Sequence, residues 1–243
     1  MKQRLDVIMV ERGLADTRTK AQALIMAGQV STDDRILDKP GQSFDDQIVL
    51  HLKDQSRYVS RAGEKLASVA PALALDFRGK IVLDVGSSTG GFTDFALQAE
   101  AAKVYCVDVG TAQLAYRLRQ DPRVVIMEQT DIREAKLPEL ADVAVIDVSF
   151  ISLTKILEAI AQLVQPGGAI VAMAKPQFEA GKALADKYNG VIPMGEERDE
   201  VLATLREWIE RHFVIEAEAD SGLAGAKGNL EHFFRLNSGT SIQ

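Results

Sequence analysis

The stretch Ile81-Val82-Leu83-Asp84-Val85-Gly86-Ser87-Ser88-Thr89-Gly90-Gly91 is typical of a buried strand, a tight glycine turn and the start of a helix. Glycines allow the backbone to turn sharply and to approach a ligand closely. The next apolar run, 104–107, ends at Asp108, 24 residues beyond Asp84. A carboxylate at that position in an α/β sheet is placed to hydrogen-bond ribose hydroxyls. The two features together predict a nucleotide site.

The composition of the turn indicates which nucleotide it binds. Ser87 and Ser88 stand where a dinucleotide fingerprint needs a second glycine, and the loop lacks the lysine of a phosphate-binding Walker loop. Asp84 would repel phosphate but could help to hold an amino group. S-adenosylmethionine has an amino group and no phosphate, so we predict it as the cofactor. The expected cofactor-binding residues are Asp84, Gly86, Ser87, Ser88, Thr89, Gly90, Gly91, Phe92, Asp108, Val109, Asp131 and Asp147.

Asp131 in this set has two interpretations. It follows an apolar run at 124–127, so it could accept a hydrogen bond from the adenine amine. An aspartate at such a position is equally typical of a helix cap.

From residue 80 onward, short apolar runs alternate with helical patterns. Strands are expected over residues 80–85, 103–107, 123–127, 142–147, 169–174, 213–217 and 230–236, and helices over 92–98, 112–119, 153–163 and 196–211. This alternation predicts an α/β fold with a parallel sheet covered on both faces.

The first part of the chain has a different sequence pattern. Residues 5–13 have helical spacing, and a second helix is expected over 18–27, capped by Thr17 and followed by Gly28. Short strands are expected near Val30, Ile36, Phe44 and residues 48–50. We therefore predict a small α+β domain at 1–53, a linker at 54–59 and a large domain at 60–243.

Composition limits the classes of function. The net charge of −7 excludes nucleic-acid binding by bulk charge, so any RNA contact must come from local basic clusters. The single cysteine, Cys106, excludes a disulfide framework and fits a reducing cytosol. The polar N-terminus is unlike a signal peptide, and no window approaches the roughly 20 apolar residues of a membrane span. We expect a cytoplasmic protein with no membrane partner and no metal; its oligomeric state is not predicted.

Two polar residues follow buried strands at the edge where such sheets bind ligands. Asp147 follows the run 143–146, and Lys175 follows 169–174 and precedes Pro176, which favours an extended conformation for Lys175. A charge after a buried run is costly unless it is paired, so these two could pair across adjacent strands. The pattern alone is equally typical of a structural salt bridge.

Several motifs occur in the order of a known family. They are Tyr58–Leu66, Asp84–Asp94, Asp108–Gly110 with Gln113–Ala115, Asp147–Ser152, Lys175–Glu179 and Gly225–Glu231. On these motifs, residues 57–236 resemble the FtsJ-type RNA ribose methyltransferases, in particular the TlyA (haemolysin A) family of rRNA 2′-O-methyltransferases. Residues 4–53 resemble the small RNA-binding domain named after ribosomal protein S4. The resemblance implies a Rossmann-like methyltransferase sheet, mostly parallel with an antiparallel last strand, and RNA as the partner, with ribosomal RNA as the expected kind.

The resemblance also implies a catalytic tetrad. The matching positions are Lys65, Asp147, Lys175 and Glu231. A ribose 2′-hydroxyl is a weak nucleophile that needs a base or a cation, and neighbouring lysines could lower each other's pKa enough for Lys175 to accept the proton. Without the family, Lys65 and Glu231 would be taken as surface charges. The chain departs from the family at Ala62, where a glycine is usual, and at Gly222, where a proline is usual.

Basic residues in the first unit and just after it define a candidate RNA-binding face. They are Arg4, Arg12, Arg18, Lys20, Arg57 and Arg61. A solvated helix face is the alternative interpretation.

Other functions compete with RNA ribose methylation. They are an RNA-binding protein that keeps the cofactor fold without methylating, and a base methyltransferase, since residues 147–150 have the position and aromatic of an amino-methylating motif but lack its two prolines. A cytolysin, which the family's older name suggests, has no support from an apolar span or a strongly amphipathic helix.

Overall fold

The computed structural model describes residues 2–53, 57–225 and 227–238. The chain divides into two compact units, Met1–Gln55 and Ser56–Gln243. Part of the predicted linker, residues 54–56, lies outside the described ranges.

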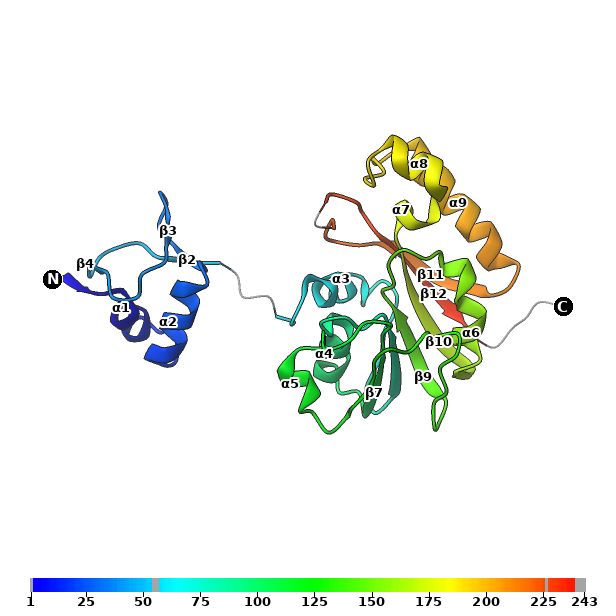
Figure 1. Ribbon diagram of the computed structural model, residues 1–243, viewed down its shortest axis with the longest axis horizontal. Helices are drawn as coiled ribbons and strands as arrows, with labels where there is room; N and C mark the ends of the chain where they lie inside the picture. The colour runs from blue at the N-terminus through cyan, green and yellow to red at the C-terminus, as the bar shows by residue number, and fades with distance from the viewer. Residues whose placement is uncertain (1, 54–56, 226, 239–243) are drawn as a thin grey trace. The chain divides into compact units, whose positions relative to one another are not determined.

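The first unit is a small α+β domain (Figure 1). Its elements are β1 (Lys2–Arg4), α1 (Leu5–Glu11), α2 (Arg18–Met26), β2 (Val30–Ser31), β3 (Ile36–Leu37), β4 (Ser43–Asp45) and β5 (His51–Leu52). The predicted cap of α2 is confirmed, because the Thr17 side chain accepts a hydrogen bond from the amide of Lys20 at 3.2 Å. The strand predicted at 48–50 is wrong: Ile48 belongs to a turn closed on Asp45, and the pairing with β2 begins at His51.

The second unit contains a seven-stranded sheet in the order β11-β12-β10-β9-β6-β7-β8. The strands are β6 (Ile81–Val85), β7 (Lys103–Val107), β8 (Val124–Met127), β9 (Ala141–Ile146), β10 (Val164–Ala174), β11 (Val214–Asp220) and β12 (His232–Asn237). Strands β6 to β10 pair in parallel, and β12 is antiparallel to both β10 and β11. The predicted mostly parallel sheet with an antiparallel last strand is therefore confirmed.

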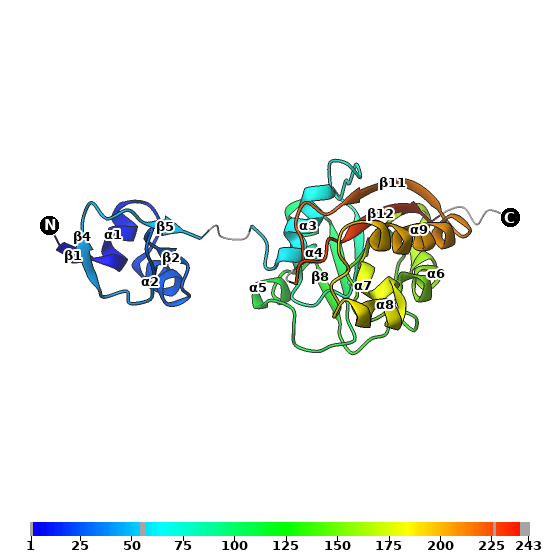
Figure 2. The same ribbon diagram turned by 90° about the horizontal axis from the view of Figure 1, so that it is seen from above.

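Helices cover both faces of this sheet (Figures 1 and 2). One face packs against α3 (Arg61–Val69), α4 (Gly91–Gln98) and α5 (Tyr116–Arg119); the other packs against the 3-10 helix η1 (Leu153–Lys155), α6 (Leu157–Ala161) and α9 (Glu196–Glu210). Because alternate residues of each strand point to opposite faces, Leu83 and Tyr105 join one apolar core, and Val82 and Val104 join the other. Two short helices, α7 (Pro176–Glu179) and α8 (Gly181–Lys187), follow β10.

The structure corrects several predicted elements. The helix expected at 112–119 is confined to Tyr116–Arg119, because Ala112 has a φ of 55° that breaks the helix. The pattern at 153–163 is split between η1 and α6 at Ile156, whose φ of −129° is not helical. The predictions omitted β1, α3, α7 and α8, which are short or have few apolar positions.

Residues 57–59, predicted as linker, belong to the second unit and pack against the rest of it. The Tyr58 ring is buried, and its centroid lies 5.5 Å from that of Phe95. The amide of Val59 donates to the Asp94 carboxylate at 2.8 Å. Burial of an aromatic ring thus draws this end of the linker into the larger unit.

Candidate active site

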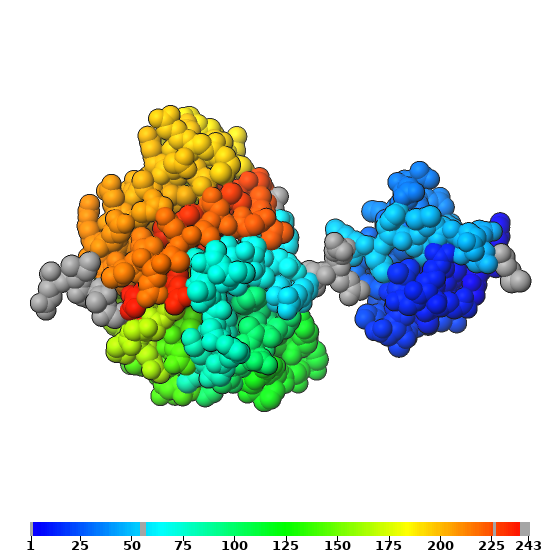
Figure 3. All heavy atoms as spheres, turned by 180° about the vertical axis from the view of Figure 1, so that it is seen from behind, coloured from blue at the N-terminus to red at the C-terminus, as the bar shows by residue number. Residues whose placement is uncertain are grey.

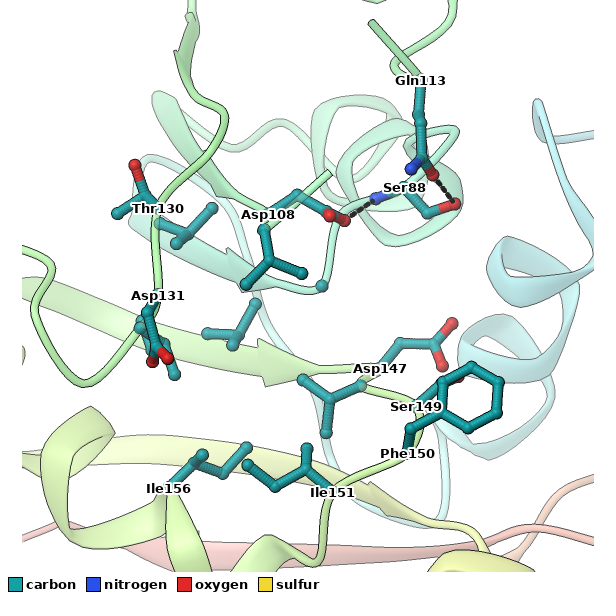
Figure 4. Close-up of a pocket in the computed structure, with 16 residues that line it drawn as sticks. Ser88, Asp108, Gln113, Thr130, Asp131, Asp147, Ser149, Phe150, Ile151 and Ile156 are labelled. Carbon is teal, nitrogen blue, oxygen red and sulfur yellow. Dashed lines mark hydrogen bonds between the residues drawn. The ribbon is translucent and has the colours of Figure 1, made fainter. Parts of the chain in front are cut away.

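A cavity of about 350 Å³ opens where β6, β7 and β9 end. Figure 4 shows Asp108, Ser88 and Gln113 along one side of the cavity, with Ile151 and Ile156 facing them. Asp131 lies at one end, and Asp147 and Phe150 lie at the other. The cavity therefore has a polar wall, an apolar wall and a carboxylate near each end.

The predicted turn builds the polar wall. The Asp108 carboxylate accepts hydrogen bonds from the amides of Ser88 and Gly110, each at 2.7 Å, and so holds the turn against the end of β7. Gly86 has a φ of 80°, and a Cβ at this position would lie 2.7 Å from the carbonyl oxygen of Asp147. Only glycine allows the ends of β6 and β9 to approach this closely.

The predicted cofactor-binding residues fall into two groups. Those that line the cavity are Gly86, Ser88, Asp108, Val109, Asp131 and Asp147. Those that lie outside the lining are Asp84, Ser87, Thr89, Gly90, Gly91 and Phe92. The second group includes buried side chains such as Asp84 and Phe92, which support the turn from behind.

Sequence reasoning also missed several lining residues. They are Val85, Val107, Gln113, Thr130, Ile132, Val148, Ser149, Phe150, Ile151 and Ile156. Most are the last residue of a strand or lie within five residues after one, and that position was the signal available in the sequence. Gln113 lies further along the chain, and its side-chain oxygen accepts a hydrogen bond from the Ser88 hydroxyl at 3.1 Å.

Asp131 lines the cavity within a turn. No helix begins at Asp131, so the alternative of a helix cap is wrong. Its carboxylate accepts from the amide of Arg133 at 2.9 Å and pairs with the Arg133 guanidinium, and these hydrogen bonds lower the pKa of Asp131 to about 2. Asp131 is therefore an ionised acceptor at this end of the cavity.

Asp84 is buried beneath the turn. One of its oxygens accepts from the Thr93 hydroxyl at 2.6 Å, and the other has no hydrogen-bond partner among the described residues. Burial raises the pKa of Asp84 to about 7, with smaller contributions from the charges of Asp147 and Asp108.

Asp84 should therefore make the stability of the protein depend on pH. Its folded pKa of about 7 lies above the ordinary value of 3.8, so ionisation disfavours the folded state as pH rises through this window. Between pH 5 and pH 8 we expect Asp84 to lower the free energy of unfolding by roughly 3 kcal/mol. Urea unfolding of Asp84→Asn should show that this part of the pH dependence is lost. An unchanged pH dependence in the variant would contradict the assignment.

Asp147 and Lys175, predicted to pair across adjacent strands, form an ion pair. The Lys175 Nζ lies 2.6 Å from the Asp147 Oδ1 and donates to the Ser149 hydroxyl at 2.9 Å. Lys175 is extended, as expected before Pro176, and Pro176 is the first residue of α7. Both side chains are largely buried, with 13% of Lys175 and 19% of Asp147 exposed.

Lys65 and Glu231 form a second, more buried ion pair. The Lys65 Nζ lies 2.6 Å from the Glu231 Oε1, although the two residues are 166 positions apart. Figure 3 shows the α3 segment, in cyan, beside the C-terminal strands, in orange and red. Two further contacts hold α3 there: the Arg61 guanidinium donates to the carbonyl of Ala224 at 2.5 Å, and the amide of Gly222 donates to the Ser68 hydroxyl at 2.9 Å.

The two pairs belong to one electrostatic cluster. Burial raises the pKa of Asp147, the charges of Lys175 and Lys65 oppose that rise, and Glu231 adds to it. The structure therefore brings together all four residues of the predicted tetrad. An arrangement of two cations and two carboxylates can hold an alcohol and receive or stabilise its proton.

A second hollow, which we call the acceptor groove, lies on the other side of this cluster. It has a volume of about 470 Å³ and is lined by Phe150, Gln177, Phe178, Ala185, Gly190, Gly225, Lys227, Asn229 and Glu231. Phe150 also lines the first cavity, so it stands where the two hollows meet. The residue is unusually exposed for a phenylalanine, at 90%, and its ring centroid lies 5.0 Å from that of Phe178.

The large unit matches a family model over nearly its whole length. Residues 58–237 match the FtsJ-like methyltransferase model, and residues 3–45 match the S4 domain. The chain belongs to the FtsJ-like methyltransferase family. The predicted family, fold and enzyme class are confirmed.

Curated relatives of this methyltransferase align over almost the whole chain. The Mycobacterium tuberculosis protein named 16S/23S rRNA (cytidine-2′-O)-methyltransferase TlyA is 39% identical, and the alignment covers 98% of this chain and 91% of that protein. Hemolysin A of Brachyspira hyodysenteriae is 37% identical over 94% of this chain and 97% of its own. A solved structure from Streptococcus thermophilus that carries a hemolysin name is 41% identical, with a TM-score of 0.74, and the match covers 99% of this chain and 90% of that one.

Ala62, where a glycine is usual in the family, lies where helices α3 and α4 of the methyltransferase pack closely. Ala62 and Gly63 of α3 approach Gly91 of α4 so closely that a Cβ on Gly91 would lie 2.8 Å from the Ala62 Cβ. Ala62 therefore fits only because Gly91 has no side chain.

The predicted RNA-binding residues of the first unit make internal contacts. Arg4 and Arg18 pair with the buried carboxylate of Asp6, and Arg12 donates to the carbonyls of Ile48 and Asp46. Lys20 pairs with Asp16 on the surface. Arg4, Arg18 and Lys20 stay about half exposed, with 46%, 54% and 49% of their side chains open.

Arg57 and Arg61 belong to the second unit. Arg57 contacts Gln98 and Tyr58, and Arg61 is bonded to Ala224. Their predicted role in RNA binding stays a prediction.

Within the described residues, no helix is long and apolar enough to cross a membrane, and no cluster of His, Cys, Asp and Glu side chains has the arrangement of a metal site.

Proposed function

We propose that this methyltransferase transfers a methyl group from S-adenosylmethionine to the ribose 2′-hydroxyl of a cytidine in ribosomal RNA. The observation that carries the proposal is the pair of buried lysine–carboxylate ion pairs between a nucleotide cavity and a second groove. The name of the M. tuberculosis relative gives the acceptor as cytidine in 16S and 23S rRNA.

The residues around the first cavity fit S-adenosylmethionine. Asp108 would accept from the ribose hydroxyls, Asp131 would accept from the adenine amine, and Ile151 and Ile156 would pack against the flat base. When bound, the cofactor supplies an electrophilic methyl group. The buried oxygen of Asp84 lies beneath the turn and lacks a partner among the described residues, so it would accept from an amino group of the cofactor through a water molecule.

The tetrad supplies what an alcohol acceptor needs. A 2′-hydroxyl is a weak acid, so its oxygen must lose its proton as the new carbon–oxygen bond forms. We propose that the Lys175 Nζ, after giving up its own proton to solvent, receives this proton as a neutral amine, and that Asp147, 2.6 Å away, stabilises the resulting ammonium. Lys65, held by Glu231, would orient the hydroxyl and stabilise negative charge on its oxygen.

The exposed ring of Phe150 is suited to contact the nucleotide that would receive the methyl group. An exposed aromatic ring beside a site is typical of proteins that stack an unpaired base. A nucleotide within an RNA helix would have to leave the base stack before its ribose could be methylated, and an exposed ring could then stack on its base.

Methyl transfer to ribosomal subunits tests the proposal. Subunits from cells that lack this protein would be incubated with it and with cofactor labelled in the methyl group. Label in dinucleotides that resist alkaline hydrolysis is expected, because a 2′-O-methyl group blocks cleavage of the adjacent phosphodiester. Label on the base would favour the base methyltransferase, and absence of transfer would favour the RNA-binding protein without methylation activity.

We further propose that the S4 domain, residues 1–53, delivers the RNA to residues 60–243 through the linker predicted at 54–59, of which residues 57–59 are packed on the larger unit. Binding would take place in the cytoplasm, where ribosomal RNA is available. The half-exposed guanidinium groups of Arg4 and Arg18, oriented by Asp6, are suited to phosphate contacts.

Salt dependence of RNA binding tests the basic face. If Lys20 contacts one phosphate, Lys20→Ala should reduce the slope of log affinity against log salt by about 0.7 to 0.9. Its pair with Asp16 is exposed, so its loss should change the stability of the domain by less than about 1 kcal/mol. The control is Arg35→Ala, which also removes one positive charge, but from the acidic turn at 32–35 and not from the proposed face. Equal slopes for the two variants would count against the proposed face.

A further inference from the structure

Two side chains that line the acceptor groove each carry a buried oxygen that lacks a hydrogen-bond partner. These oxygens are the Gln177 Oε1 and the Glu231 Oε2, and neither accepts a hydrogen bond from any residue in the described part of the chain. The other oxygen of Glu231 accepts from Lys65 at 2.6 Å. A buried acceptor without a partner is rare in folded proteins and costs about 1–3 kcal/mol, so its presence in a groove indicates an occupant that brings donors.

The position of Gln177 connects it to both the tetrad and the aromatic pair. It lies in α7, two residues after Lys175 and directly before Phe178. The Phe178 ring centroid lies 5.0 Å from that of Phe150 and 5.9 Å from the Lys175 Nζ. A flat group in contact with these rings would therefore lie within reach of both the proton acceptor and the Gln177 amide.

We infer that the acceptor groove holds the base of the target nucleotide and that Gln177 selects a base with an exocyclic amino group, cytosine rather than uracil. This inference rests on the proposed function. Cytosine presents an amino group where uracil presents a carbonyl oxygen. The buried Oε1 of Gln177 accepts a hydrogen bond from the amino group, whereas a carbonyl there places two acceptors against each other. The Glu231 Oε2 is also an acceptor, so it adds to the preference for a base that carries a hydrogen-bond donor.

Matched variants separate this role from a structural one. Gln177→Met keeps the length of the side chain and removes the acceptor, and Gln177→Glu keeps an acceptor at the same position. Gln165→Met is the control, because Gln165 is exposed at the start of β10, the opposite end of the strand from Lys175.

Two readouts use the full-length chain. In the first, the affinities for short oligocytidylate and oligouridylate are measured for each variant. In the second, methyl transfer is measured on ribosomal RNA transcripts with cytidine or uridine at the position that the labelling of ribosomal subunits identifies as methylated. We expect the wild type to favour cytidine by roughly 10- to 100-fold in both, and Gln177→Met to lose most of that preference. Gln177→Glu and Gln165→Met should retain it.

The outcomes distinguish this inference from the proposed function. If Gln177→Met keeps the cytidine preference, or the wild type has none, the role of Gln177 is overturned even if the enzyme methylates ribose. If the wild type transfers no methyl group but binds oligocytidylate more tightly in a Gln177-dependent manner, the proposed function fails and the role of Gln177 in base selection stands.

Discussion

Replacement of Lys175 by alanine is expected to slow methyl transfer by roughly 100- to 10,000-fold while leaving the affinity for the cofactor nearly unchanged. Lys175 is paired with Asp147, and it does not line the cofactor cavity. Single-turnover transfer and calorimetric titration of the cofactor measure the two quantities separately. Lys136→Ala, which removes an exposed lysine before β9, is the control.

Lys175→Arg distinguishes a proton acceptor from a structural cation. Arginine keeps the positive charge and the pairing with Asp147, but it cannot be deprotonated in a protein. We expect the arginine variant to fold and bind the cofactor but to be almost as inactive as the alanine variant. Recovery of activity with arginine would show that Lys175 acts only through its charge. Urea unfolding of both variants is needed, since loss of one partner from a buried pair can cost about 3–5 kcal/mol.

Gly86→Ala is expected to weaken cofactor binding by on the order of 100-fold and to reduce transfer with it. The added Cβ would lie 2.7 Å from the carbonyl oxygen of Asp147, so the ends of β6 and β9 must separate. That movement displaces both the cavity wall and one member of the tetrad. Calorimetric titration of the cofactor measures the effect.

Gly167→Ala is a matched control for this change. Gly167 has a φ of 81°, almost the same as that of Gly86, but a Cβ there would contact nothing within 4 Å. The variant should lose about 1–2 kcal/mol of stability from backbone strain and keep its affinity for the cofactor. If the two alanine variants bind the cofactor equally well, the close approach at Gly86 has no functional importance.

Much of the fold could be predicted because the strands of the large unit are short, buried and bounded by turns. The predicted strand at 103–107 matches β7 residue for residue, and the predicted helix at 196–211 exceeds α9 by one residue. The failures occur where local preference is weak. Helix α3 has a charged and small-residue composition, and its buried side is formed by contacts with α4 and with Gly222, Ala224 and Glu231.

The candidate site was only partly accessible from the sequence. Asp147 and Lys175 each follow a buried strand, and β9 and β10 are neighbours, so their pairing could be expected. Lys65 and Glu231 carry no such signal and were identified by family resemblance alone. The acceptor role of Gln177 could not be anticipated, since a glutamine in a short helix is ordinary until its surroundings are known.

The sequence by itself determined the alternation of strands and helices, the glycine turn at 86–91 and the carboxylates that follow the strands. These features depend on backbone preference and on apolar patterns within a few residues, so they can be recognised locally. Only the tertiary structure decided that Lys65 of α3 pairs with Glu231, that Asp84 lies beneath the turn, and that Phe150 stands between two hollows. Those outcomes depend on packing between segments far apart in the chain, where burial and pairing set the energy of a charged or polar side chain.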